Sequence, residues 1–174
     1  MKIPLMATRY DLPALFDALK YRVGAEIGVD HGYFSRHLLA SSRLDRLYSV
    51  DSWQGKFGKC IADAKHYLAE FGHRSEIIHR SASQAAASLS DNNVRLDFAY
   101  IDASHREQSV ALDMQDWAPL VKPGGCLCGH DYCDQPMTGV IQAVDGFAAE
   151  RGLPVFVTSE PWASWLIFMP EQAA

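Results

Sequence analysis

The sequence predicts an α/β fold: a doubly wound, mostly parallel seven-stranded sheet that closes with a C-terminal antiparallel hairpin. Short apolar runs typical of strands alternate with segments of helical spacing almost without interruption. The run Leu96–Ile101 is apolar at nearly every position, as in a central parallel strand that is buried on both faces. The length suits one domain over residues 1–174, with an N-terminal helical segment over 1–21 and a core over 22–170.

The elements follow in order from their spacing. Asp11 is placed to cap a first helix, whose apolar stripe consists of Leu12, Leu15, Phe16 and Leu19. Five strands are expected at Val23–Val29, Leu47–Val50, Glu76–His79, Leu96–Ile101 and Cys126–Gly129. The helices between them are expected at Tyr33–Ala40, along Ile61, Ala64, Leu68 and Phe71 up to a capping Gly72, at Gln84–Leu89, and from Val110 to Trp117.

The remaining segments predict how the sheet ends. Lys122–Gly125 is expected to be a turn before the fifth strand, and a helix is expected over Thr138–Arg151. The last two strands, Val155–Thr158 and Trp165–Met169, have a turn and no helix between them. We therefore expect them to pair antiparallel at one edge of the sheet.

Composition disfavours several classes of function. The net charge is −5 and the basic residues are scattered, which disfavours a nucleic-acid partner. No apolar run reaches the roughly 18–20 residues of a membrane span, and the N-terminus lacks a signal-peptide pattern, so a cytoplasmic protein with no membrane partner is expected. The four cysteines form no CxxC framework; we interpret them as buried free thiols, with a metal or redox site as the alternative.

A glycine loop and a later acid indicate a nucleoside-bearing cofactor. Gly28 and Gly32 follow the first strand, where a ligand can approach the backbone and the next helix offers its N-terminus. Asp51 follows the second strand and is placed to accept hydrogen bonds from ribose hydroxyls. The spacing differs from the GxGxxG of nicotinamide-binding proteins, because Glu26 precedes the loop and no third glycine follows.

Glu26-x-Gly28-x-x-x-Gly32, Asp51 and the segment 97–132 (DFAYIDASHREQSVALDMQDWAPLVKPGGCLCGHDY) resemble the class I S-adenosylmethionine-dependent methyltransferases. Within that class, the similarity is greatest to the small-molecule O-methyltransferases that include the macrocin and catechol enzymes. The resemblance implies a methionine-binding loop at Glu26, Gly28 and Gly32 with Asp30 and His31 beside it, ribose binding by Asp51, and Ser52, Trp53, Ala82 and Ser83 near the adenine. It also implies that Asp102 faces the methionine portion or a metal.

A second group of polar residues follows the fourth and fifth strands. Asp102 and His105 come after one strand, and His130 and Asp131 come after the next, so the four can converge at one edge of the sheet. The resemblance implies a divalent metal, magnesium in the metal-dependent members, on Asp102, His130 and Asp131. Because imidazole at position 130 suits manganese, zinc or iron better than magnesium, the metal's identity stays open. In the metal-free alternative, His105 is the general base and Asp102 is a hydrogen-bonding group.

The expected function is transfer of a methyl group from S-adenosylmethionine to an oxygen of a small-molecule acceptor. The alternatives are a catalytically silent S-adenosylmethionine-binding module and a nicotinamide-dependent oxidoreductase. The pocket roof is expected from the N-terminal helix, the loop 53–59 or a neighbouring subunit. Trp162 and Trp165, expected to be exposed, favour a homo-oligomer, with packing in an edge strand as the alternative for Trp165.

Overall fold

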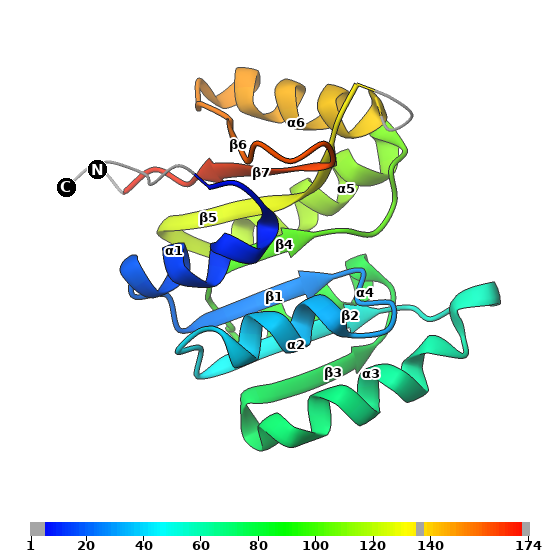
Figure 1. The fold of residues 1–174 in the computed structure, drawn as a ribbon. Helices are drawn as coiled ribbons and strands as arrows, with labels where there is room; N and C mark the ends of the chain where they lie inside the picture. The colour runs from blue at the N-terminus through cyan, green and yellow to red at the C-terminus, as the bar shows by residue number, and fades with distance from the viewer. Residues whose placement is uncertain (1–5, 135–137, 172–174) are drawn as a thin grey trace.

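The structure is a computed structural model that describes residues 6–134 and 138–171. These residues form one seven-stranded sheet in the order β3-β2-β1-β4-β5-β7-β6 (Figure 1). The strands are β1 (Val23–Ile27), β2 (Arg46–Asp51), β3 (Ser75–His79), β4 (Leu96–Ile101), β5 (Val121–Tyr132), β6 (Phe156–Val157) and β7 (Ala163–Phe168). The first five are parallel, and β7 pairs antiparallel with both β5 and β6. The predicted fold and its C-terminal antiparallel pair are confirmed.

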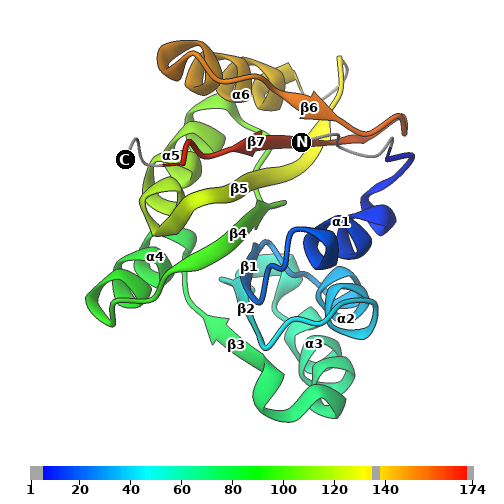
Figure 2. The same cartoon turned by 90° about the vertical axis from the view of Figure 1, so that its left-hand side faces the viewer.

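The helices divide between the two faces of the sheet, as Figure 2 shows. They are α1 (Leu12–Ala18), α2 (Tyr33–Ala40), α3 (Cys60–Leu68), α4 (Ala82–Asp91), α5 (Glu107–Trp117) and α6 (Thr138–Arg151). On one face, α1 and α2 bury an apolar cluster in which the rings of Phe16 and Phe98 stack with centroids 4.1 Å apart. On the other face, α4, α5 and α6 cover a second cluster that includes Met114 and Val144. Cys126 and Cys128 are buried on the α1–α2 face as free thiols, as predicted.

Of the two predicted helix caps, one is wrong and the other closes a longer helical run than α3. Asp11 does not cap α1; its carboxylate accepts from the backbone of Ala7 and Thr8, and Thr8 caps a 3₁₀ turn at Arg9–Asp11 that precedes the helix. α3 itself stops at Leu68, but a 3₁₀ turn continues the helical run, and Gly72, with a φ of +53°, breaks that run where the capping glycine was predicted. Short helical turns next to an α-helix carry the same apolar spacing, so the sequence pattern did not separate them.

Two further expectations at the C-terminal side are corrected. Lys122–Gly125 is not a turn before β5 but an irregular part of that strand, where the register with β4 shifts. Trp165 is fully buried in β7, whereas Trp162 is 44% exposed, so only one of the two tryptophans is available to a partner. None of the helices in the described residues is long and apolar enough to cross a membrane.

The topology fixes where a ligand can approach. The strand order reverses between β1 and β4, which are neighbours although two strands separate them in sequence. Loops leaving the carboxyl ends of these two strands diverge to opposite faces and open a crevice. The residues that follow β1, β2, β4 and β5 lie around this crevice.

Candidate active site

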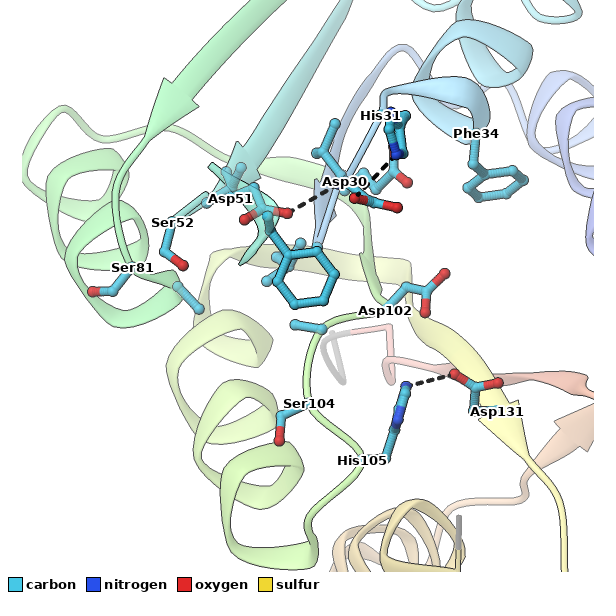
Figure 3. A pocket seen from close by; sticks show the side chains of 18 of the residues that line it. Asp30, His31, Phe34, Asp51, Ser52, Ser81, Asp102, Ser104, His105 and Asp131 are labelled. Carbon is cyan, nitrogen blue, oxygen red and sulfur yellow. Dashed lines mark hydrogen bonds and ion pairs between the residues drawn. The ribbon is translucent and has the colours of Figure 1, made fainter. Parts of the chain in front are cut away.

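A cavity of about 670 Å³ occupies the crevice at the carboxyl ends of the parallel strands (Figure 3). Its volume is in the range of sites that bind small molecules and cofactors. We distinguish two sides of it. The glycine-loop side consists of Glu26, Gly28, Asp30, His31 and Asp51. The Arg9 side consists of Arg9, Asp102, His105 and Asp131.

Gly28 directly follows β1 and packs against the backbone that follows β4, where no larger residue fits. Its φ of +96° lies in the region that favours glycine, and a Cβ would lie 2.0 Å from the carbonyl oxygen of Asp102. The backbone of Asp102 donates to the Ile27 carbonyl at 2.7 Å, which holds the two strand ends together. Gly28 therefore joins the two sides of the cavity. Gly32 does not line the cavity; it begins α2 in a left-handed conformation.

Glu26 is a buried carboxylic acid at the floor of the glycine-loop side. The side chain is 1% exposed and accepts a short hydrogen bond from the hydroxyl of Ser35, which also contacts Ser49. Burial raises the pKa of Glu26 to about 8, because the hydrogen bond from Ser35 only partly offsets the loss of water. A cationic group placed in the cavity would favour its ionised form.

Asp51 shapes the glycine-loop side through its two carboxylate oxygens. One accepts from the backbone of Asp30 at 2.9 Å and the other from the backbone of Trp53 at 2.7 Å. Each oxygen keeps a further lone pair, so these contacts are compatible with accepting ligand hydroxyls. Asp51 thus orders the loop and faces the cavity.

The residues expected near an adenine ring divide into two groups. Ser52 and Ala82 line the cavity, together with Ser81, whose hydroxyl caps α4. Ser83 is exposed on α4 and does not line the cavity. Trp53 is buried behind the loop, where its indole donates to the Asp30 carbonyl at 2.8 Å, and it does not line the cavity either.

Arg9 reaches the cavity from the N-terminal 3₁₀ turn. Its Nη1 lies 3.0 Å from Oδ2 of Asp102, and its guanidinium carbon lies 4.8 Å from the ring centroid of Phe34. Its backbone donates to Glu160 at 2.6 Å, which fastens the turn to the segment between β6 and β7. The cavity is also lined by Gln54 and Phe57 of the loop 53–59, one of the three expected sources of its roof, whereas the helix α1 contributes none of the lining residues.

His105 and Asp131 form a pair on the Arg9 side. Nε2 of His105 lies 2.8 Å from Oδ2 of Asp131, and Nδ1 of His130 lies 3.1 Å from the other oxygen. Burial opposes the charge of Asp131, but the hydrogen bond from His130 and the nearby positive charges outweigh it and lower the pKa of Asp131. Asp131 therefore stays ionised and holds the His105 ring in place.

The three residues that could hold a metal ion here differ from the predicted set in one member, because His105 takes the place of His130. Ligand atoms of Asp102, His105 and Asp131 lie within 4.8 Å of one another, whereas His130 does not line the cavity and contacts Asp131 from behind. The Arg9 guanidinium already supplies a cation to Asp102, and both Asp131 oxygens face histidine nitrogens. A divalent ion would meet this fixed positive charge, so these residues do not fit a metal well.

Burial also governs Asp102, despite its ion pair. Its side chain is 20% exposed, and desolvation raises its pKa although His130 and Arg9 act in the opposite direction. The positive charge of Arg9 therefore offsets part of the desolvation that favours the protonated form of Asp102.

Two residues of the cavity were not identified from the sequence, Arg9 and Ser81. Arg9 is 93 positions from its partner Asp102 and belongs to no motif, whereas the capping box of Ser81 and Gln84 was readable in the sequence.

Comparison with known proteins gives the family. A family model described as a methyltransferase domain matches residues 25–132, which include both sides of the cavity except Arg9. A curated relative, the protein y4gI of Sinorhizobium fredii (strain NBRC 101917 / NGR234), is 25% identical over 127 residues; the match covers 67% of this chain and 14% of that protein.

Solved structures show the same fold. An O-methyltransferase from Bacillus cereus in complex with S-adenosylhomocysteine matches with a TM-score of 0.73 and 18% identity, over 92% of this chain and 79% of that chain. The O-methyltransferase TomG from Streptomyces achromogenes, in complex with S-adenosylmethionine, matches with a TM-score of 0.68 and 19% identity, over 92% and 78%. The solved structures thus share the fold that the resemblance predicted, and the family model shows that the chain belongs to the methyltransferase-domain family.

Proposed function

We propose that this protein transfers a methyl group from S-adenosylmethionine to an oxygen of a small-molecule acceptor. The observation that carries the proposal is the single cavity that joins the glycine loop and Asp51 to the His105–Asp131 pair. Family membership supports methyl transfer, and the names of the similar structures support oxygen as the acceptor atom. The scattered basic residues favour a small molecule over a nucleic acid.

The glycine-loop side binds the cofactor in this proposal. Glu26 lies beneath the methionine portion, and a bound ammonium group would hold it ionised against its raised pKa. Asp51 accepts from the ribose hydroxyls while it keeps the loop ordered. Ser52, Ser81 and Ala82 border the space left for the adenine.

The Arg9 side binds and deprotonates the acceptor. As the acceptor oxygen attacks the methyl carbon, the carbon–sulfur bond breaks, S-adenosylhomocysteine leaves, and the acceptor's proton passes to His105. Since Asp131 holds Nε2 of His105, Nδ1 is the nitrogen available to take that proton. The guanidinium of Arg9 stabilises the negative charge that develops on the acceptor oxygen.

The reaction proposed here needs no divalent metal. Arg9 supplies on Asp102 the positive charge that a metal would otherwise bring to the acceptor. Added magnesium or manganese should therefore leave turnover unchanged. Loss of turnover on chelation, restored by magnesium or manganese, would contradict this part of the proposal and favour the metal-assisted alternative.

The experiment measures binding and turnover separately. We expect S-adenosylhomocysteine to bind in calorimetry and labelled S-adenosylmethionine to methylate members of a panel of phenols, sugars and amines. His105→Gln should lower turnover about 10²–10⁴-fold without changing S-adenosylhomocysteine affinity. His66→Gln, the same change at an exposed histidine of α3, is the control. No binding of S-adenosylhomocysteine contradicts the proposal, and binding with no turnover of any acceptor supports the silent binding module.

A further inference from the structure

A second group of ligand-type side chains lies on the outer edge of the glycine loop. Asp30 and His31 belong to the loop between β1 and α2, and Cys60 is the first residue of α3. One nitrogen, one sulfur and one carboxylate oxygen of these three residues lie within 4.8 Å of one another. Asp30 and His31 also line the cavity, whereas Cys60 lies behind them.

The separations match those of ligands around one tetrahedral zinc ion. Nε2 of His31 lies 3.3 Å from Sγ of Cys60 and 3.9 Å from Oδ1 of Asp30. With a zinc–nitrogen distance of about 2.0 Å and a zinc–sulfur distance of about 2.3 Å, tetrahedral ligands lie about 3.3–3.6 Å apart. Small side-chain movements are enough to bring all three atoms to one ion.

Asp63 of α3 orients the histidine for this role. Its Oδ2 lies 2.7 Å from Nδ1 of His31, and because a carboxylate only accepts, Nδ1 must carry the proton. The lone pair of neutral His31 is then on Nε2, which points toward Cys60 and Asp30. A carboxylate that holds the far nitrogen of a ligating histidine is the usual support of protein metal sites.

The backbone and the exposure of the three residues also suit an ion. A Cβ on Gly32 would lie 3.0 Å from the Cα of Ala64, so the glycine lets α3 approach the loop closely. The side chains of Asp30 and His31 are 53% and 32% exposed, which leaves solvent access for a water in the fourth position. A thiolate and a carboxylate would together neutralise the ion's charge of +2.

We propose that Asp30, His31 and Cys60 form a site for a borderline divalent cation, of which zinc is the best match. Binding transfers the thiol proton of Cys60 to solvent and forms bonds from the metal to sulfur, nitrogen and oxygen. The ion ties the loop between β1 and α2 to α3 and so stiffens one wall of the cavity. The site does not depend on methyl transfer, and it differs from the Arg9 side, where a guanidinium occupies the place of a cation.

Cobalt(II) is the probe, because its bond to a thiolate gives a sulfur-to-metal absorption band and its unfilled shell reports tetrahedral geometry. We expect one cobalt per chain, a thiolate band in the wild-type protein, and displacement by zinc. Cys60→Ser should abolish the band, and His31→Gln should weaken cobalt affinity strongly. Asp63→Asn should weaken it about 10–100-fold, as is typical for a residue that orients a ligand.

Two controls separate this site from others. Cys133→Ser removes another thiol, and Asp131→Asn alters the other group of candidate ligands, Asp102, His105 and Asp131. Both variants should retain the cobalt–thiolate absorption band. Zinc should also raise the Tm of the wild-type protein but not that of Cys60→Ser. No band in the wild-type protein, or a band that survives Cys60→Ser, overturns the proposal, and circular dichroism verifies that each variant is folded.

Discussion

The two sides of the cavity are built in different ways. On the glycine-loop side, every residue lies at the carboxyl end of β1 or β2 or in the loop that follows β1, and Asp51 holds that loop through the backbone of Asp30. On the Arg9 side, the contact between Arg9 and Asp102 joins residues 93 positions apart, and His105 is held by a residue of the next strand. The glycine-loop side is therefore encoded near the ends of two strands, whereas the Arg9 side, which binds the acceptor in our proposal, depends on contacts between distant parts of the chain.

The largest effect is expected at the point where the two sides meet. Gly28→Ala would place a Cβ 2.0 Å from the Asp102 carbonyl oxygen at a φ that disfavours alanine, so β1 and β4 must separate. We expect no measurable S-adenosylhomocysteine binding in calorimetry and a lower Tm. Gly146→Ala in α6, where a Cβ meets no atom within 4 Å, is the matched control and should stabilise the protein by up to about 1 kcal/mol. Normal cofactor binding by Gly28→Ala would show that the contact is not essential.

A smaller effect, confined to the affinity for the cofactor, is expected on the glycine-loop side. Asp51→Asn replaces a charged acceptor with a neutral one, and hydrogen bonds to a charged group contribute about 1.5–3 kcal/mol. S-adenosylhomocysteine affinity should fall about 10–100-fold in calorimetry, while turnover at saturating S-adenosylmethionine should change less. Asp45→Asn, an exposed position before the amino end of β2, should change neither quantity. Unchanged affinity in Asp51→Asn would remove this residue from the cofactor site.

Arg9→Gln is expected to have the reverse effect of Asp51→Asn: it should lower turnover and leave the affinity for S-adenosylhomocysteine nearly unchanged. The variant removes the cation from Asp102 and from the ring of Phe34, so turnover should fall about 10-fold or more while S-adenosylhomocysteine affinity stays within about twofold. Arg9→Lys keeps the charge and should recover part of the lost turnover. If Arg9→Gln instead weakened cofactor binding alone, the division of the cavity into two sides would be incorrect.

These differences explain what the sequence could predict. The fold, the glycine loop and Asp51 follow from periodicity and from residues placed directly after strands. The family resemblance placed Trp53 and Ser83 near the adenine, but the backbone turns Trp53 behind the loop, and the helix start at Ala82 leaves Ser83 exposed. The sequence alone does not show that Arg9 forms an ion pair with Asp102. It also does not show that the histidine closest to both Asp102 and Asp131 is His105 and not His130.

The last effect concerns stability and not turnover: a pH-dependent change in stability is expected at Glu26, measured without cofactor. The pKa of Glu26 is about 8 in the folded protein, above the ordinary value of 4.5, so between these values the folded protein keeps a proton that the unfolded chain has lost. Stability therefore falls as pH rises through this window. Glu26→Gln keeps a partner for Ser35 and cannot ionise, so its Tm should equal that of the wild-type protein near pH 4.5, exceed it increasingly up to about pH 8, and then keep a constant difference of several degrees. A Tm difference for Glu26→Gln that does not change with pH would mean that Glu26 is ionised throughout, and the cofactor's ammonium group would then meet a carboxylate already charged before it binds.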